Sequence, residues 1–119
     1  AVAIDAELSI VGESRVHFDS DLPHYGTRDG CHRGAGGRVT SPTLLWVEAL
    51  ELALSRLAEQ GCPFDRVAAV SGSGQQHGSV YWRREGVEAL RGLSASRGTA
   101  AEQLRGAFAE EQSPIWMDT

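Results

Sequence analysis

The sequence is organised around the stretch Val67-Ala-Ala-Val-Ser-Gly-Ser-Gly-Gln-Gln-His-Gly-Ser-Val-Tyr-Trp82. Its first four residues are apolar and partly β-branched, which predicts a buried strand over 67–70 in an α/β sheet. Residues 71–78 are small and polar, and their three glycines would let the backbone turn sharply and approach a ligand. We therefore predict a strand, a glycine-rich loop and a second strand over 79–82.

Two amides and an imidazole, Gln75, Gln76 and His77, stand inside this loop, and they donate and accept hydrogen bonds in several directions. In α/β sheets, ligands bind beyond the carboxyl ends of strands, which is where the loop would lie. Uncharged amides beside an imidazole suit a neutral polyhydroxyl ligand better than a phosphate, which calls for Arg or Lys. The alternative is an ordinary polar loop with a structural histidine.

The length of 119 residues is enough for one compact domain and no more. The net charge of −5 and the lack of any basic run argue against nonspecific nucleic-acid binding. All eleven basic residues are Arg, so a catalytic, Schiff-base or P-loop lysine is excluded within these residues. No apolar run approaches the roughly 18 residues that a membrane span needs, and we predict none.

The two cysteines, Cys31 and Cys62, lie far apart without a Cys-x-x-Cys spacing. This pattern predicts neither a disulfide nor a metal site, and it favours a reduced, cytoplasmic protein. Residues 19–40 are predicted to be one long irregular loop, which in a compact domain is usually functional or disordered. Its histidines and aspartates match no metal-ligand spacing, so we predict no metal there. They are His24, His32, Asp19, Asp21 and Asp29.

Strands are predicted at both ends of the chain. Residues 1–4 and 8–11 read as an antiparallel pair, and the alternation over 16–18 predicts a half-exposed strand whose His17 faces solvent. Residues 113–118 are predicted to be an apolar strand that delivers an aromatic ring and a carboxylate.

Two helices have clear start signals. Ser41 and Pro42 suit the N-cap and first position of a helix that would stop at Gly61. Thr99 and Glu102 form a capping-box pattern for a short helix that continues through residue 108. The first helix should bury one apolar stripe against the sheet, with Trp46 used for packing. The stripe consists of Leu44, Val47, Leu50, Leu54 and Leu57.

Two motifs together resemble one known family. They are Gly72-Ser-Gly-Gln-Gln-His-Gly-Ser-Val-Tyr-Trp82 and Pro114-Ile-Trp-Met-Asp118. Four shorter pieces support them: His17-Phe-Asp19, Asp21-Leu-Pro23, Gly26-Thr27, and Thr40-Ser-Pro42 with Trp46-Val47. These residues, which span nearly the whole chain, resemble the FGGY carbohydrate kinases, and the Gln-Gln-His-Gly run resembles the xylulose-kinase branch of that family.

The resemblance implies a ribonuclease H-like, actin-like α/β fold with a mixed sheet and flanking helices, of which residues 1–119 would be part of the N-terminal, sugar-binding domain. It implies an enzyme that transfers the γ-phosphoryl group of MgATP to the O5 hydroxyl of D-xylulose. By that likeness His77 contacts the sugar, Gln76 and Gln75 lie beside it, and Trp116 and Asp118 border the same pocket. The residue types agree, because an uncharged ketopentose needs hydroxyl-matching hydrogen bonds and an apolar wall.

Some parts of the family pattern are missing from these residues. The family begins with a strand that ends in an Asp-x-Ser/Gly-Thr phosphate loop, whereas Ala1 falls within what would be the second strand. The second domain, with the catalytic aspartate and the adenine site, is missing too. We therefore expect no catalytic residue, MgATP site or metal site within 1–119, no kinase activity of the isolated chain, and at best weak sugar affinity. The unpaired sheet edge also predicts self-association.

Three other functions stay open. The chain could be a non-catalytic sugar-binding module. It could belong to another FGGY kinase that acts on glycerol, gluconate, ribulose or fucose derivatives, although the glycerol branch resembles an Asn-Gln-Arg-Glu run where this chain has Gln75-Gln-His-Gly78. It could also be an interaction domain whose glycine-rich loop serves a partner, but the charge pattern identifies no such partner.

Overall fold

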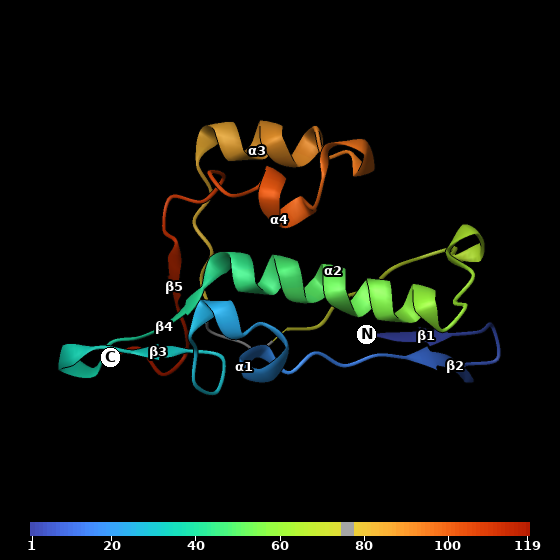
Figure 1. The fold of residues 1–119 in the computed structure, drawn as a ribbon, viewed down its shortest axis with the longest axis horizontal. Coiled ribbons are helices and arrows are strands. Elements are labelled where there is room, and N and C mark those ends of the chain that lie inside the picture. Colours follow the sequence, from blue (N-terminus) through green and yellow to red (C-terminus); the bar gives the residue numbers. More distant parts are fainter. Residues whose placement is uncertain (75–77) are drawn as a thin grey trace.

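The computed structural model describes residues 1–74 and 78–119, which form helices and small antiparallel sheets around one long helix, α2 (Thr43–Glu59) (Figure 1). The strands are β1 (Val2–Ile4), β2 (Ile10–Glu13), β3 (His32–Arg33), β4 (Val39–Pro42) and β5 (Gln112–Pro114). The other helices are α1 (Phe18–Asp21), α3 (Arg84–Arg91) and α4 (Ala100–Gln103), with 3₁₀ turns η1 (Pro23–Tyr25), η2 (Ala35–Gly37), η3 (Phe64–Arg66) and η4 (Ala95–Arg97). The mixed α/β composition agrees with the prediction.

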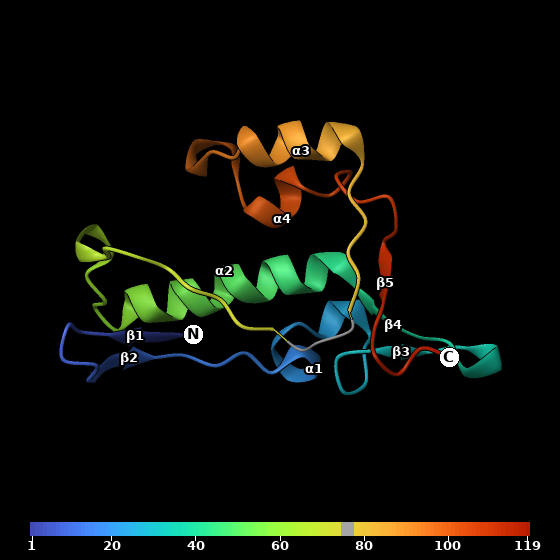
Figure 2. The same cartoon turned by 180° about the vertical axis from the view of Figure 1, so that it is seen from behind.

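The described strands form two separate antiparallel sheets rather than one mixed sheet. The hairpin β1–β2, predicted from the first residues, lies beside the C-terminal half of α2 (Figures 1 and 2). The order β3-β4-β5 makes up the second sheet, at the N-terminal end of α2. The predicted strand over 16–18 is wrong, because helix α1 begins at Phe18 and the backbone N–H of His17 donates to the Asp21 carboxylate. His17 is exposed, as predicted.

Helix α2 begins later than predicted. Ser41 and Pro42 belong to β4, because pairing with β5 keeps them extended, and Thr43 is the first helical residue. The Ser41 hydroxyl therefore does not cap the helix and donates instead to the carbonyl oxygen of Gly30 at 2.8 Å. The predicted stop is confirmed, since Gly61 follows the helix with a φ of 82°.

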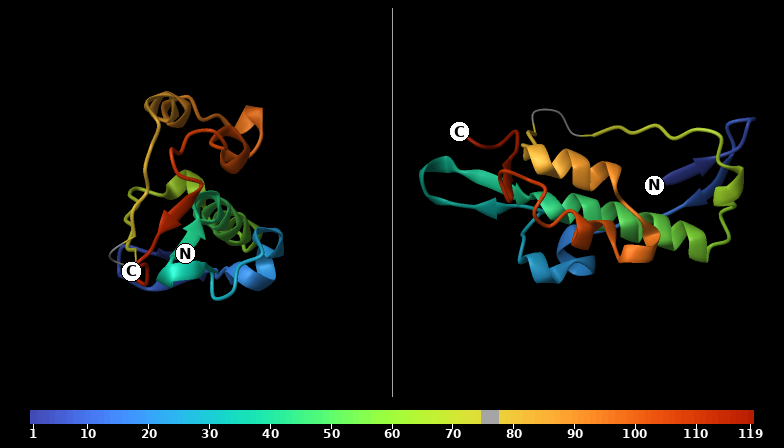
Figure 3. Two further views of the ribbon diagram at one scale, coloured as in Figure 1. Left: turned by 90° about the vertical axis from the view of Figure 1, so that its left-hand side faces the viewer. Right: turned by 90° about the horizontal axis from the view of Figure 1, so that it is seen from above.

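The predicted apolar stripe of α2 is wrong in part. Leu57 is buried, but Leu50 and Leu54 are 58% and 41% exposed. The buried positions are Leu45, Ala49, Ala53 and Leu57, which face α1 and the first hairpin. The helix has a second apolar side, because Leu44 and Val47 pack against a cluster of Leu104, Ala107 and Phe108. Two layers contact α2: α3 and α4 lie on one side, and α1 with the β1–β2 hairpin lies on the other (Figure 3). These two contacts determine which residues of α2 are buried.

The capping box of α4 is confirmed. The Thr99 hydroxyl accepts from the N–H of Glu102 at 3.1 Å, and the Glu102 carboxylate accepts from the N–H of Thr99 at 3.0 Å. The helix ends at Gln103, so the predicted continuation through 108 is wrong; the chain turns there, and Leu104, Ala107 and Phe108 are buried. Glu51 of α2 accepts from the N–H groups of Ala100 and Ala101, which joins the two helices.

The predicted strands over 67–70 and 79–82 are not formed. Val67 is 47% exposed and Val70 is 91% exposed, and Trp82 makes only an isolated bridge to Phe108. A strand needs a partner for its backbone hydrogen bonds, and no described strand lies beside 67–70. The segment runs along α2 without pairing (Figures 2 and 3).

The predicted loop over 19–40 and the predicted strand over 113–118 also differ from the structure. The loop contains α1, η1 and the β3–β4 hairpin. Only residues 112–114 at the other end are a strand. Cys31 is buried and Cys62 half-buried, and both are free thiols. No described helix has the length and apolar character needed to cross a bilayer.

The docking of α3 gives a test of the fold. A Cβ at Gly86 would collide with the carbonyl oxygen of Ala107 and lie 2.8 Å from its carbonyl carbon. We expect Gly86→Ala to lower the free energy of unfolding by about 1–3 kcal/mol, measured by urea denaturation. Gly106→Ala is the matched control, because a Cβ there meets no atom within 4 Å. Equal stability of the two variants would contradict the close packing of α3.

Candidate functional site

Several distant parts of the chain meet at one cavity of about 550 Å³, which we call the tryptophan cavity. Its wall comes from α1, the turn at residues 29–30, the strand β4, the helix α2, the segment around the glycine-rich loop, and the residues that follow β5. The lining residues are Phe18, Asp29, Gly30, Ser41, Trp46, Ala49, Ser73, Gly74, Gly78, Val80, Ile115, Trp116 and Met117. The set is mainly apolar and includes no arginine, so the described wall suits an uncharged ligand.

The predicted sugar-binding loop begins and ends at this cavity. Gln75, Gln76 and His77 lie outside the described residues, but the glycines on either side of them, Gly74 and Gly78, both line the cavity. The roles predicted for the three side chains therefore stay predictions.

Of the two other predicted site residues, one lines the cavity and one does not. Trp116 lines the tryptophan cavity and is 55% exposed. Asp118 is not among the lining residues, and its carboxylate accepts from the backbone N–H of Val39 at 2.7 Å. In this structure Asp118 thus anchors the end of the chain to β4. The structure brings Trp116 together with the borders of the predicted loop but uses Asp118 for a backbone contact.

The cavity has two tryptophans in its wall, and only Trp116 was predicted to border the site. Trp46 packs against the core cluster of Leu22, Leu45 and Ala49, as expected, but it also lines the cavity, where it joins Trp116. Aromatic side chains present apolar faces that suit the C–H face of a sugar ring or chain. Sequence reasoning missed this second role because Trp46 lies far from Trp116 along the chain, and only the fold brings them to one cavity.

One carboxylate organises the turn that forms the polar edge of the cavity. Asp19 accepts from the Thr27 hydroxyl at 2.7 Å and from the backbone N–H groups of Asp29 and Gly30 at 2.7 and 3.0 Å. The Thr27 hydroxyl first, and then the Gly30 amide, lower the pKa of Asp19 because they stabilise its charged form. Asp19 therefore holds residues 27–30 in one conformation.

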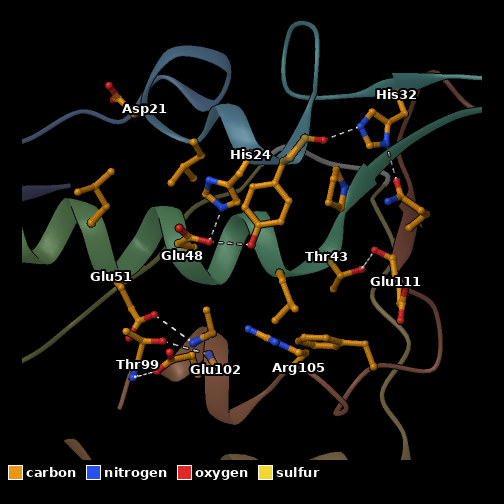
Figure 4. A pocket seen from close by; sticks show the side chains of 18 of the residues that line it. Asp21, His24, His32, Thr43, Glu48, Glu51, Thr99, Glu102, Arg105 and Glu111 are labelled. Atoms are coloured by element: carbon orange, nitrogen blue, oxygen red, sulfur yellow. Dashed lines mark hydrogen bonds and ion pairs between the residues drawn. The ribbon is translucent and has the colours of Figure 1, made fainter.

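A second, larger cavity of about 1180 Å³ lies between α2, α4 and the loop after α1 (Figure 4). Several of its polar groups partner one another. Glu48 accepts from the Tyr25 hydroxyl at 2.8 Å and lies 3.0 Å from Nε2 of His24. Burial, and then the hydrogen bond to Glu48, raise the pKa of Tyr25. The His32 ring lies within hydrogen-bond distance of Gln112 and of the Tyr25 carbonyl oxygen.

Neither Trp116 nor Asp118, the two predicted site residues that the structure describes, lines this second cavity. Within residues 1–74 and 78–119, no group of three potential metal ligands gathers there or elsewhere. We therefore take the tryptophan cavity as the candidate site.

Comparison with known proteins shows similarity to xylulose kinases over essentially the whole chain. The chain is 51% identical to "Xylulose kinase 2" of Arabidopsis thaliana over 121 residues and 47% identical to "Xylulose kinase" of Rattus norvegicus over 119 residues. It is 40% identical to "Xylulose kinase" of Saccharomyces cerevisiae. These matches cover 98–100% of the chain and 20–22% of each relative, so the chain spans about a fifth of their length. No family model matches the chain. The predicted resemblance is confirmed.

The turn held by Asp19 should be sensitive to acid. Because the folded-state pKa of Asp19 is below its ordinary value of 3.8, its stabilisation is complete above that pH and is lost as the pH falls through the lower folded-state pKa. In an NMR titration from about pH 6 to about pH 2, the amide signals of Asp29 and Gly30 should shift together, with a midpoint below the ordinary aspartate pKa.

The Asp19→Asn variant should lose this titration step. Asp65→Asn, which removes a carboxylate from the distant turn η3, should keep it. A midpoint at the ordinary aspartate pKa in the unmodified chain would contradict the hydrogen bonds assigned to Asp19.

Proposed function

Because the chain is a homologue of the xylulose kinases over its whole length, we propose that it supplies part of the sugar-binding side of an ATP-dependent D-xylulose kinase. In this reaction the γ-phosphoryl group of MgATP passes to the O5 hydroxyl of the sugar. The observation that carries the proposal is the identity of 40–51% to three xylulose kinases from a plant, an animal and a yeast.

The tryptophan cavity would be the place where the sugar binds. His77 and Gln76 would hydrogen-bond its hydroxyls, with Gln75 beside them, and Trp116 would face its C–H surface. Asp118 would border the pocket once the sugar and the rest of the enzyme are present. The cavity geometry supports this assignment, because Gly74, Gly78 and Trp116 share one wall that includes no arginine in its described part. A ketopentose is uncharged and needs hydrogen-bonding partners rather than a cation.

We propose that residues 1–119 belong to an N-terminal domain with a ribonuclease H-like fold. The catalytic base and the MgATP site would lie in the part of the relatives that this chain does not match. Homology supports this division, since the chain spans about a fifth of those enzymes. Bound MgATP would supply the phosphoryl group, while this chain would bind and orient the sugar. The cytoplasmic location stays a prediction.

A chimeric enzyme tests the function directly. The 119 matching residues of the rat xylulose kinase are replaced by this chain. We expect D-xylulose-dependent ATP consumption in a coupled assay, whereas the isolated chain should show none. His77→Ala should lower kcat/KM by at least about fivefold, because the loss of a polar contact with the sugar costs about 1–3 kcal/mol. His17→Ala, which changes an exposed histidine, should leave activity unchanged.

The other outcomes separate the alternatives. A folded chimera that uses another sugar or polyol, and not D-xylulose, would favour a different FGGY kinase. An inactive but folded chimera, together with millimolar or tighter xylulose binding by the isolated chain in calorimetry, would favour a non-catalytic module. Turnover by the isolated chain would contradict the proposed division of the active site.

We also propose that the isolated chain self-associates through the β1–β2 sheet, because apolar residues on it are largely exposed. Val2, Ile4, Ile10 and Val11 are 55–64% exposed. Sedimentation velocity should show concentration-dependent dimers or larger species. Ile4→Lys should shift them toward monomer, since edge lysines oppose strand pairing. Val70→Lys, at an exposed site outside any strand, should not. A monomer at all concentrations would contradict this proposal.

A further inference from the structure

We propose that Asp29 is a specificity-determining residue of the sugar site, where its carboxylate accepts hydrogen bonds from hydroxyl groups of the bound sugar. The proposal rests on the proposed function and adds a residue that the sequence motifs do not mark. Asp29 lines the tryptophan cavity together with Trp46 and Trp116, and its side chain is exposed there.

The position of Asp29 is held from several directions. Its backbone has a φ of 55°, a left-handed conformation that non-glycine residues adopt at a cost, and Asp is among the few that tolerate it. Its N–H donates to Asp19, and so does the N–H of Gly30. The Gly30 carbonyl oxygen accepts from the buried Ser41 hydroxyl. The turn is therefore fixed to both α1 and β4, which holds the backbone of Asp29 in place at the cavity edge.

The chemistry of this edge points to hydroxyl donors. Among residues 1–74 and 78–119, no side chain forms an ion pair or hydrogen bond with the Asp29 carboxylate. The Ser41 hydroxyl is already used on Gly30, so Asp29 and Ser73 are the polar side chains left on the described wall. An ionised carboxylate accepts short hydrogen bonds that are about twice as strong as neutral ones.

The same carboxylate disfavours phosphate. A sugar phosphate carries negative charge, and like charges in a partly desolvated cavity repel one another. The described wall offers no arginine to offset this repulsion. Asp29 would thus help the site to prefer an unphosphorylated sugar over its phosphorylated product, a discrimination that an amide at the same place could not provide.

The test uses the chimeric enzyme described above, which contains the full chain. Asp29→Asn should raise the KM for D-xylulose by about tenfold, with kcat and the KM for ATP nearly unchanged, because it weakens sugar binding rather than the chemical step. Inhibition by D-xylulose 5-phosphate, relative to the affinity for D-xylulose, should become stronger. Asp65→Asn is the matched control, since Asp65 lines neither cavity.

A second measurement distinguishes a loss of sugar binding from a loss of the fold. In the isolated chain, D-xylulose at millimolar concentrations should shift the NMR amide signals of Asp29 and Gly30, and Asp29→Asn should remove this response while the remaining spectrum is retained. An active chimera whose KM and product inhibition are unchanged by Asp29→Asn would overturn the role of Asp29 alone. A lowered kcat at constant KM would do the same. A folded chimera without D-xylulose activity would instead overturn the proposed function.

Discussion

The antiparallel pairing of β4 with β5 holds the start of α2 to the C-terminal part of the chain. It joins residues that are 70 or more positions apart, with Ser41 opposite Ser113 in the register. Side chains reinforce it, because the Thr43 and Ser113 hydroxyls lie 2.8 Å apart and the N–H of Thr43 donates to the carbonyl oxygen of Glu111. Beyond β5, the Asp118 carboxylate holds the backbone of Val39. The pairing thus sets where α2 begins and brings Trp116 back to the tryptophan cavity.

The two cavities differ in the kind of side chain that lines them. In the larger one, Glu48 bonds to Tyr25 and lies within hydrogen-bond distance of His24, and these contacts join α2 to the turn η1. In the tryptophan cavity, aromatic and small residues predominate and the Asp29 carboxylate has no described partner. A carboxylate next to apolar rings suits a sugar, because a sugar has donor hydroxyls on some faces and C–H groups on others. The proposed sugar site at this cavity is therefore compatible with the similarity to xylulose kinases.

Local signals in the sequence predicted the local structure well. The hairpin at the start, the stop of α2 at Gly61 and the capping box of Thr99 and Glu102 are all found, since each depends on residues within a few positions of one another. The resemblance to xylulose kinases was likewise contained in contiguous motifs, and the relatives confirm it. The strand over 67–70 was predicted from an equally clear pattern, yet it does not form, because a strand is stabilised by a neighbour that its own residues do not specify.

Residues close together along the chain were therefore enough to predict the type of several elements and the family that the chain resembles. Packing between distant segments determines which side of α2 is buried, because two layers contact the helix and a single apolar stripe could not show that. It also determines that Ser41 stays in a strand, and that Asp29, Trp46 and Trp116 share one cavity. Secondary-structure propensity and helix capping act over a few neighbouring residues, whereas burial and cavity lining depend on which distant segments pack together.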